Sequence, residues 1–442
     1  MNEPPARTLH TRREFLHKSM LGAAAAWTLP VFIQNTFSAL EAMAAESPYR
    51  GVTGKDAPIL VVLQLAGGND GLNTLVPYAD DAYFRARTRL GIPARNVLKL
   101  NDSIGLNPGL SGMRSLYDAG AMAIVQGVGY PNPNRSHFRS TEIWQTASDA
   151  GEYRSYGWLG RYFDSCCRGE DPTVCVSIGR QRPQAFASAN PTGISLARPE
   201  SYRWNNGGDD SEDAEAAFLE LNCPEGSQMK EENAGGSIEE IGGAEHTKGS
   251  PLDFLQRVAL DAQLSSDRIL EIAKKSRSDV QYPKGNLGSS LHLVGRMIAG
   301  GFSTRVYYVN HGGYDTHSRQ NDSHSRLMRE LDAAVSAFCR DMKAQGNFER
   351  VTLMTFSEFG RRVSENASGG TDHGAAAPMF LFGGGLKPGL FGKYPSLTDL
   401  ERGDLIFNVD FRSVYATVLE QWLGTPGERV LGRKFATLPI FG

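Results

Sequence analysis

The sequence is poor in the features that define several classes of protein. Its five cysteines form no C-x-x-C pair, so they indicate neither a disulfide framework nor a structural zinc cluster. Its 46 lysines and arginines are balanced by 49 aspartates and glutamates, so the basic excess needed to bind a phosphate backbone is missing. Beyond the amino-terminal segment, no run approaches the ~18 consecutive apolar residues of a membrane-spanning helix. We therefore expect no nucleic-acid partner and no stable membrane span in the mature form.

Common catalytic motifs are also missing. There is no Gly-x-Ser-x-Gly sequence, which disfavours an α/β-hydrolase esterase. The motifs His-Glu-x-x-His, Gly-x-x-x-x-Gly-Lys and, after a strand, Gly-x-Gly-x-x-Gly are absent too, which excludes zincin-protease, P-loop and dinucleotide-binding sites. No fixed-period repeat indicates a solenoid or a propeller. The function must therefore lie in a different combination of residues.

The first 44 residues have the order of a twin-arginine export signal. The pair Arg12-Arg13 precedes a modest apolar run at 20–29, and Ala42-Met43-Ala44 offers a small-x-small cleavage site. The run is too short and too rich in alanine to span a ~30 Å hydrocarbon core. An amphipathic helix is the alternative. The sequence thus predicts a signal peptide at 1–44, the twin-arginine translocase as a transient partner, and a mature chain in the periplasm or secreted.

Residues 45–442 are predicted to form a single α/β domain. Short apolar runs rich in β-branched residues predict buried strands, and segments of helical periodicity lie between them. The predicted strands cover 58–65, 122–128, 305–310, 351–356 and 379–382. The predicted helices cover 81–90, 108–118, 252–275, 287–299, 323–343 and a carboxy-terminal segment from Asp410 to Leu423. This alternation predicts a mostly parallel central sheet with helices on both faces. The segment 205–249, rich in Gly, Asn, Asp and Glu, is predicted to be a flexible acidic insertion.

Side chains that can bind a metal follow the predicted strands. Ligands of parallel sheets bind outside the carboxyl ends of the strands, so the loops at those ends matter most. These loops contain Asp70, Asp315, His317, Glu358, Asp372 and His373. Carboxylates mixed with imidazoles suit Zn²⁺ or Mn²⁺ better than Ca²⁺, and the sequence predicts a site for one or two such ions. Each motif alone is also consistent with a turn or a polar loop that binds nothing.

Ser136 stands where a helix is predicted to begin. It is either an N-cap, which satisfies a free backbone N–H, or a nucleophile beside a cation. In the second case it would face a phosphoryl or sulfuryl group attracted by the helix dipole. Its neighbours Arg135 and His137 are predicted to bind that anion or to act as acid and base, with plain solvation as the alternative.

Five strings together resemble a known family. They are LAGGNDGLNTLVP, NRSHFRSTEIWQT, GGYDTHSRQ, TFSEFGRRVSEN and GTDHG, spread over nearly the whole mature chain. The chain is thereby similar to the exported bacterial proteins grouped as domain-of-unknown-function family 1501. The resemblance implies a fold like that of the alkaline phosphatase and sulfatase superfamily. It implies no known substrate.

The resemblance also implies roles for individual residues. By position, Asp70 would be a metal ligand, Ser136 the candidate nucleophile, and Asp315 and His317 ligands in the next loop. Glu358 stands where an Asp-His pair is expected, and no histidine follows His373. In one interpretation, Glu358 replaces that pair and His373 is the last ligand. In the other, Asp372-His373 is the pair and one ligand is missing. We favour the first, because Glu358 directly follows its strand.

The sequence therefore favours an exported, metal-dependent hydrolase of phosphate or sulfate esters. Its nucleophile would be Ser136 or a metal-bound water, because the Cys-x-Pro-x-Arg sequence of formylglycine sulfatases is absent. The substrate would be a small anionic ester or a sulfated or phosphorylated glycan. The alternative is a non-catalytic, metal-containing envelope protein that binds a glycan or a protein partner.

Overall fold

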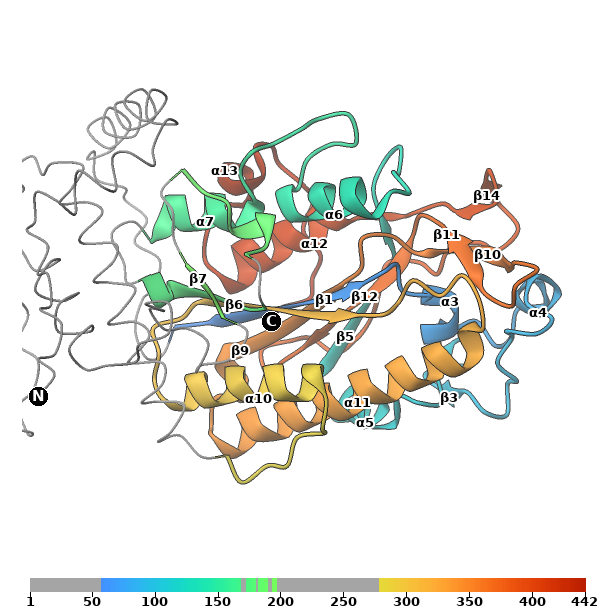
Figure 1. Ribbon diagram of the computed structural model, residues 1–442, viewed down its shortest axis with the longest axis horizontal. Coiled ribbons are helices and arrows are strands. Elements are labelled where there is room, and N and C mark those ends of the chain that lie inside the picture. Colours follow the sequence, from blue (N-terminus) through green and yellow to red (C-terminus); the bar gives the residue numbers. More distant parts are fainter. Residues whose placement is uncertain (1–56, 168–171, 180–181, 190–192, 197–277) are drawn as a thin grey trace, which may run out of the picture. The chain divides into compact units, whose positions relative to one another are not determined.

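One large sheet forms the centre of the described part of the chain (Figure 1). The computed structural model describes residues 57–167, 172–179, 182–189, 193–196 and 278–442, which fall within one compact unit. Nine strands of this part form the sheet. In spatial order they are β13 (Gly389–Phe391), β5 (Met122–Gly129), β12 (Ala377–Phe382), β9 (Val351–Phe356), β1 (Ile59–Ala66), β8 (Val306–Gly312), β6 (Cys175–Ile178) and β7 (Ile194–Leu196), with β16 (Val409–Asp410) also paired to β5.

The sheet is parallel except at one strand. β1 pairs in parallel with β8 and β9, and β6 pairs in parallel with β8 and β7. β12 runs antiparallel to both β9 and β5. The predicted mostly parallel sheet is confirmed, and the predicted strand 379–382 is the exception, because an apolar run buried on both faces carries no signal of direction. The carboxyl ends of β5, β1, β8 and β9 consequently meet the amino end of β12 at one edge.

Helices cover both faces of the sheet, as predicted (Figure 1). α6 (His137–Thr146), α7 (Trp158–Cys166), α12 (Phe411–Thr417) and α13 (Gly427–Leu431) lie on one face, and α5 (Ser111–Asp118), α10 (Asn286–Ala299) and α11 (Gln320–Ala344) lie on the other. β1 alternates between the two cores, since side chains of successive strand residues point to opposite faces. Val61 packs in the cluster that includes α10 and α11, and Leu60 packs in the cluster that includes α7 and α12.

Short elements build the edge of the sheet where the strands end. They are α3 (Gly71–Thr74), α4 (Asp81–Ala86), the three-stranded sheet of β2 (Leu75–Val76), β4 (Gly105–Leu106) and β3 (Leu98–Lys99), the pair β10 (Arg361–Glu365) and β11 (Thr371–His373), and the hairpin β14 (Leu400–Glu401) and β15 (Asp404–Leu405). Short helical turns cover Pro172–Val174, Gln184–Phe186, Phe348–Arg350 and Val418–Trp422. The sequence did not predict the short strands, because two to five residues are too few to show a period.

Other sequence predictions have mixed outcomes. The carboxy-terminal helix begins as expected after Asp410, whose carboxylate accepts from Arg412 N at 2.9 Å. Cys166 and Cys167 form a disulfide that the sequence did not predict, whereas Cys175 and Cys339 are buried thiols.

The export signal at 1–44, the insertion at 205–249 and the helix at 252–275 lie outside the described residues. Among the helices that are described, none is long and apolar enough to cross a membrane.

Candidate metal centre

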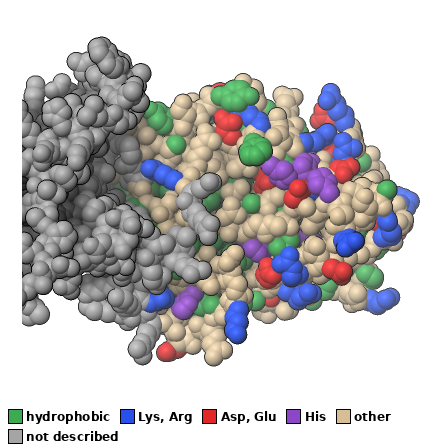
Figure 2. All heavy atoms as spheres, viewed as in Figure 1, with side chains coloured by type: hydrophobic (Ala, Val, Ile, Leu, Met, Phe, Trp, Pro, Cys, Tyr) green, Lys and Arg blue, Asp and Glu red, His purple; other side chains and the backbone are tan. Residues whose placement is uncertain are grey.

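Four loops deliver carboxylate and imidazole groups to one point at the edge of the sheet. His137 is the first residue of α6, which follows β5, and Asp315 and His317 follow β8. Glu358 follows β9, and His373 ends β11 just before β12. His137, Asp315 and His373 each offer a ligand atom, and these atoms all lie within 4.8 Å of one another. Figure 2 shows histidine side chains gathered on the surface beside acidic and basic ones.

Asp315 lies at the centre of three imidazoles. Its Oδ1 is 3.1 Å from Nε2 of His317 and 3.1 Å from Nε2 of His373, and its Oδ2 is 3.5 Å from Nε2 of His137. The Nε2 atoms of His317 and His373 are 2.9 Å apart. Ligand atoms around a tetrahedral zinc ion with bonds of ~2.0–2.1 Å are separated by roughly 3.3 Å. We call these four side chains the histidine cluster; His137, Asp315 and His373, whose ligand atoms all lie within 4.8 Å of one another, have the spacing of ligands to one ion.

The opposite nitrogen of each imidazole faces an oxygen. Nδ1 of His137 is 2.9 Å from Oε1 of Glu358, and Nδ1 of His373 is 2.8 Å from the carbonyl oxygen of Arg135. Nδ1 of His317 is 3.5 Å from Oδ1 of Asp372. A carboxylate or a carbonyl can only accept, so with a cation bound on the Nε2 side the protons of His137 and His373 would sit on Nδ1 and their Nε2 lone pairs would point to the ion. Ligating histidines are oriented in this way by an outer hydrogen-bond acceptor.

Two buried atoms at this site have no hydrogen-bond partner in the described part of the chain. They are Nε2 of His137 and Oε2 of Glu358. Leaving a buried polar atom unpaired costs about 1–3 kcal/mol, so such atoms call for a ligand. A cation bound to the histidine cluster would satisfy Nε2 of His137. The residues present thus fit a divalent metal.

The protonation states of Asp315 and His373 also suit a metal. Burial would raise the pKa of Asp315, but hydrogen bonds from Arg361 and His373 outweigh burial and lower this pKa to about 2. Burial lowers the pKa of His373, against the opposing effect of its hydrogen bonds to Arg135 and Asp315. At neutral pH the carboxylate is therefore ionised and the imidazole is neutral, which are the forms that bind metal.

Arg361 holds the loops of the site together. Its buried guanidinium donates to Oδ1 of Asp315 at 2.7 Å and to the carbonyl oxygens of Gly68 (2.7 Å), Tyr314 (3.0 Å) and Thr371 (2.8 Å). Three loops are thereby fixed to one side chain. The sequence did not single out Arg361, because nothing in the string distinguishes it from Arg362, whose side chain is partly exposed.

Glycine allows two of these loops to touch. Gly67 has φ +121°, and a Cβ atom there would lie 2.4 Å from the backbone nitrogen of Asp315. No other residue could adopt this conformation and let the β1 loop approach so closely. The backbone N–H of Gly67 also donates to Oε1 of Glu358 at 2.8 Å, which orients the carboxylate that accepts from His137.

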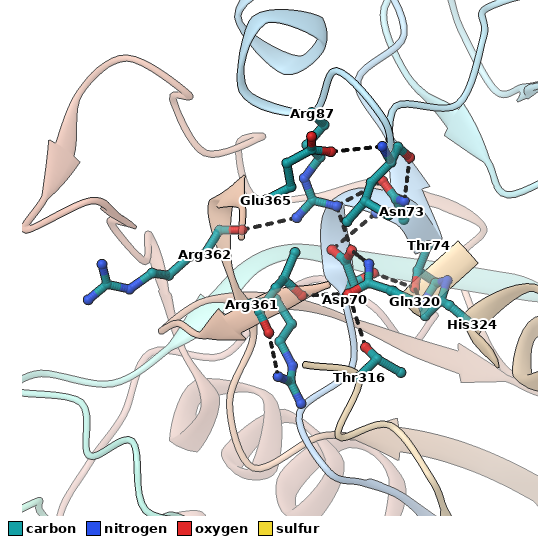
Figure 3. A network of polar contacts seen from close by, with 12 residues as sticks. Asp70, Asn73, Thr74, Arg87, Thr316, Gln320, His324, Arg361, Arg362 and Glu365 are labelled. Carbon is teal, nitrogen blue, oxygen red and sulfur yellow. Dashed lines mark hydrogen bonds and ion pairs between the residues drawn. The ribbon is translucent and has the colours of Figure 1, made fainter. Parts of the chain in front are cut away.

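Asp70, a predicted metal ligand, lies in a different network (Figure 3). Its carboxylate is fully buried, lies 2.5 Å from Nη1 of Arg87, and also accepts from Gln320 and from the backbone of Asn73. Burial would raise the pKa of Asp70, but Arg87 reverses the effect and the pKa is lowered. The structure does not bring Asp70 into the histidine cluster. The sequence offered no sign of this pairing, because Arg87 was an ordinary charged residue within the helix predicted at 81–90.

Ser136 and Arg135 occupy the amino end of α6. Ser136 is the N-cap residue by backbone conformation, but its exposed hydroxyl makes no capping hydrogen bond. The hydroxyl is therefore available to a substrate next to His137. The guanidinium of Arg135, predicted to bind an anion, instead forms an ion pair with Asp404, while the carbonyl oxygen of Arg135 accepts from His373.

His324, which the sequence analysis did not assign to the site, lies beside Asp70. Its Nε2 is 3.2 Å from Oδ1 of Asn69, and burial lowers its pKa from 6.5 to about 4. Between pH 6.5 and about 4, the imidazole of His324 is therefore protonated in the unfolded chain but neutral in the folded protein. Stability should fall as the pH drops from about 6.5 to about 4, by roughly 3 kcal/mol at most.

Urea unfolding at about pH 7 and about pH 4.5 checks this prediction. The variant His324→Gln, which cannot titrate, should lose much less stability over that interval. The contribution of Asp70 does not interfere, because a lowered carboxylate pKa removes stability only below about pH 4. Equal losses in the two proteins would contradict the assignment to His324.

Several solved structures are similar to this chain at low sequence identity. Similar solved structures include a protein in the alkaline phosphatase superfamily from Vibrio parahaemolyticus (10% identity, 87% of this chain and 71% of that chain, TM-score 0.37). Others are the lipoteichoic acid synthase LtaP from Listeria monocytogenes (9%, 92% and 80%, 0.37) and the PsFucS1 sulfatase from Pseudoalteromonas sp. (11%, 92% and 74%, 0.35). The first of these proteins belongs to the superfamily that the motifs predicted, and similarity this low defines no activity for this chain.

A family of proteins also matches part of this chain by sequence. Residues 250–431 match the family described as "Protein of unknown function (DUF1501)". This match covers the strings GGYDTHSRQ, TFSEFGRRVSEN and GTDHG and confirms the resemblance that they indicated. No curated protein matches the chain.

Proposed function

We propose that this protein is an exported, metal-dependent hydrolase of phosphate or sulfate esters. The observation that carries the proposal is the histidine cluster, in which the Nε2 atoms of three imidazoles face Asp315. His137, Asp315 and His373 would hold the ion, and His317, which contacts Asp315 and His373, lies beside them. Zn²⁺ or Mn²⁺ is favoured by the donor set. Glu358 and Asp372 would orient imidazoles rather than bind the ion. Export rests on the motif at 1–44, which lies outside the described residues.

The proposal is for one ion. A second ion would need a further carboxylate, and the oxygens of Asp70 already accept from Arg87, Gln320 and Asn73. Arg87 supplies the positive charge that a second metal would bring to this carboxylate. This differs from the sequence prediction, which left one or two ions open and counted Asp70 among the ligands.

The residues of the chain define how an ester would be handled. When bound, the ion would supply Lewis-acid stabilisation of the anionic ester. The amino end of α6 would add free backbone N–H groups and a helix dipole that favour an anion. The exposed hydroxyl of Ser136 lies at this end and has no capping role. Ser136 is therefore the candidate nucleophile, and water is the alternative.

A Ser136→Ala variant tests the nucleophile. Turnover of aryl phosphate and aryl sulfate esters is measured on zinc-loaded and manganese-loaded protein. If Ser136 attacks, the variant should lose roughly 10³-fold or more in kcat while its metal content is unchanged. A loss smaller than about tenfold would assign the attack to water. Ser188→Ala, an exchange of the same kind in a loop outside the site, is the control.

A non-catalytic, metal-containing envelope protein that binds a glycan or a protein partner is the second candidate. The observation that favours it is the ion pair between Asp70 and Arg87, which leaves the site with fewer available carboxylates than a two-metal centre needs. In that case no ester of a broad panel of phosphate and sulfate monoesters and diesters would turn over on metal-loaded protein. Any turnover abolished by His373→Asn would exclude this candidate.

A further inference from the structure

A groove of about 640 Å³ opens beside the histidine cluster. One wall is the loop Pro131–Arg135, and the other is formed by the β14–β15 hairpin and the residues that follow it to Phe407. The carbonyl oxygen of Arg135, in the first wall, accepts from Nδ1 of His373 at 2.8 Å. The groove therefore shares Arg135 with the surroundings of His373 and ends two residues before His137. Its volume falls within the ~300–1,000 Å³ typical of ligand sites.

The hairpin is fixed in place by Asp404. The side chain of Asp404 is buried, forms an ion pair with Arg135, and has Oδ1 at 3.7 Å from Nε of Arg362. Arg135 lies two residues before His137, and Arg362 follows Arg361. Arg135 lies in the loop before α6 and Arg362 lies in β10, so the hairpin keeps a fixed position relative to the histidine cluster.

Arg402 occupies an unfavourable backbone position at the tip of this hairpin. Glu401 pairs with Asp404, which leaves a two-residue turn of Arg402 (φ +55°) and Gly403 (φ +83°). Turns with two positive φ angles favour Asn-Gly or Gly-Gly, and an arginine there is strained. Within the described residues, the exposed guanidinium of Arg402 has no hydrogen bond or ion pair that would offset the strain. Strain of this kind is typical of functional positions.

The lining of the groove suits a hydroxyl-rich ligand. Arg402 offers donors, the exposed carboxylate of Glu401 offers acceptors, and the amide of Asn132 offers both. Pro131 and Phe407 add apolar surface against which the face of a ring can lie. An acyl chain would leave the polar groups unpaired, and a polyanion would be repelled by Glu401.

We propose that the groove binds the alcohol portion of the ester, that this portion is a sugar, and that Arg402 determines its recognition. The inference rests on the proposed function for the location of the ester. The sugar contacts themselves do not depend on the metal. Arg402 and Glu401 would bind neighbouring hydroxyls, and the anionic group would lie at the histidine cluster.

The test measures binding of neutral trisaccharides (maltotriose, cellotriose and chitotriose) to the full chain by calorimetry. Arg402→Gly removes the guanidinium and relieves the turn, so folding should be unharmed and the melting temperature should not fall. We expect at least one trisaccharide to bind, with a tenfold or greater loss of affinity in Arg402→Gly and in Glu401→Gln. Arg319→Gly is the matched control, because Arg319 also has a positive φ (+48°) and does not line the groove.

The outcomes separate this inference from the proposed function. Binding of a trisaccharide should be insensitive to salt and should survive in His373→Asn, even if that variant holds no metal. Turnover of aryl esters with no trisaccharide binding would overturn the groove assignment and leave the hydrolase intact. The groove assignment would also be overturned if Arg402→Gly left the affinity unchanged. The same holds if only polyanionic oligosaccharides bound and their binding disappeared at high salt.

Discussion

Replacing His373 by asparagine should abolish binding of the proposed metal ion at the histidine cluster. The side-chain amide of asparagine can donate to the carbonyl oxygen of Arg135, as Nδ1 of His373 does, but it places no atom at the position of Nε2. The loop before His137 should therefore stay in place while one ligand is lost. Changing even an outer partner of a ligand typically costs 10–100-fold in metal affinity, so loss of the ligand itself should cost more than about 100-fold. Turnover should fall with metal content.

Elemental analysis of protein purified without chelator measures the first effect. His373→Gln is the matched variant, because a glutamine amide reaches the position of Nε2 and should keep part of the affinity. His292→Ala is the control, since His292 lies on α10 and stacks on Tyr282 with ring centroids 4.7 Å apart. Metal that remains stoichiometric in His373→Asn would refute the histidine cluster as the binding site.

The second large effect should come from Asp70→Asn, and it should concern stability rather than metal. The exchange keeps the shape of the side chain but leaves the buried guanidinium of Arg87 without its counter-charge. Breaking a buried ion pair on one side costs about 3–5 kcal/mol. Chemical denaturation should show this loss, whereas Asp118→Asn, which breaks an exposed pair with Arg114, should change stability by less than about 1 kcal/mol.

Metal content decides between the two roles of Asp70. The sequence predicted a ligand, and a ligand changed to asparagine would lower the bound metal. The ion pair with Arg87 instead predicts unchanged stoichiometry in Asp70→Asn when the measurement is made under conditions where the variant is folded. A loss of metal with unaltered stability would restore Asp70 to the metal centre.

Much of the fold was predictable because it depends on patterns of local sequence. The strand expected at 58–65 is β1, the helix expected at 287–299 is α10, and the strand expected at 351–356 is β9. Each has a long apolar run or a clear helical period. The direction of β12 was not predictable, because the pairing of a doubly buried strand depends on the rest of the sheet.

The sequence predicted which types of residue gather at the site better than it predicted which of them are in contact. The loops after the strands contain the residues that the structure brings together, including His317 and His373. Which carboxylate faces which imidazole depends on distances between loops that are far apart in sequence. Arg361 and Arg87 illustrate the limit, because each is buried by pairing with a carboxylate that no local pattern connects to it.

The pairing of β1 has a consequence for how the chain folds. Its two neighbours in the sheet, β8 and β9, are synthesised much later, and Gly67 meets Glu358 across 291 residues. Contacts of such long range are slow to form because the intervening loop must close first. While the chain is still incomplete, β1 presents two open and strongly apolar edges, which favour aggregation. The nascent amino-terminal half thus depends on protection from association until β8 and β9 emerge, and the side chains of the histidine cluster cannot assemble before that moment.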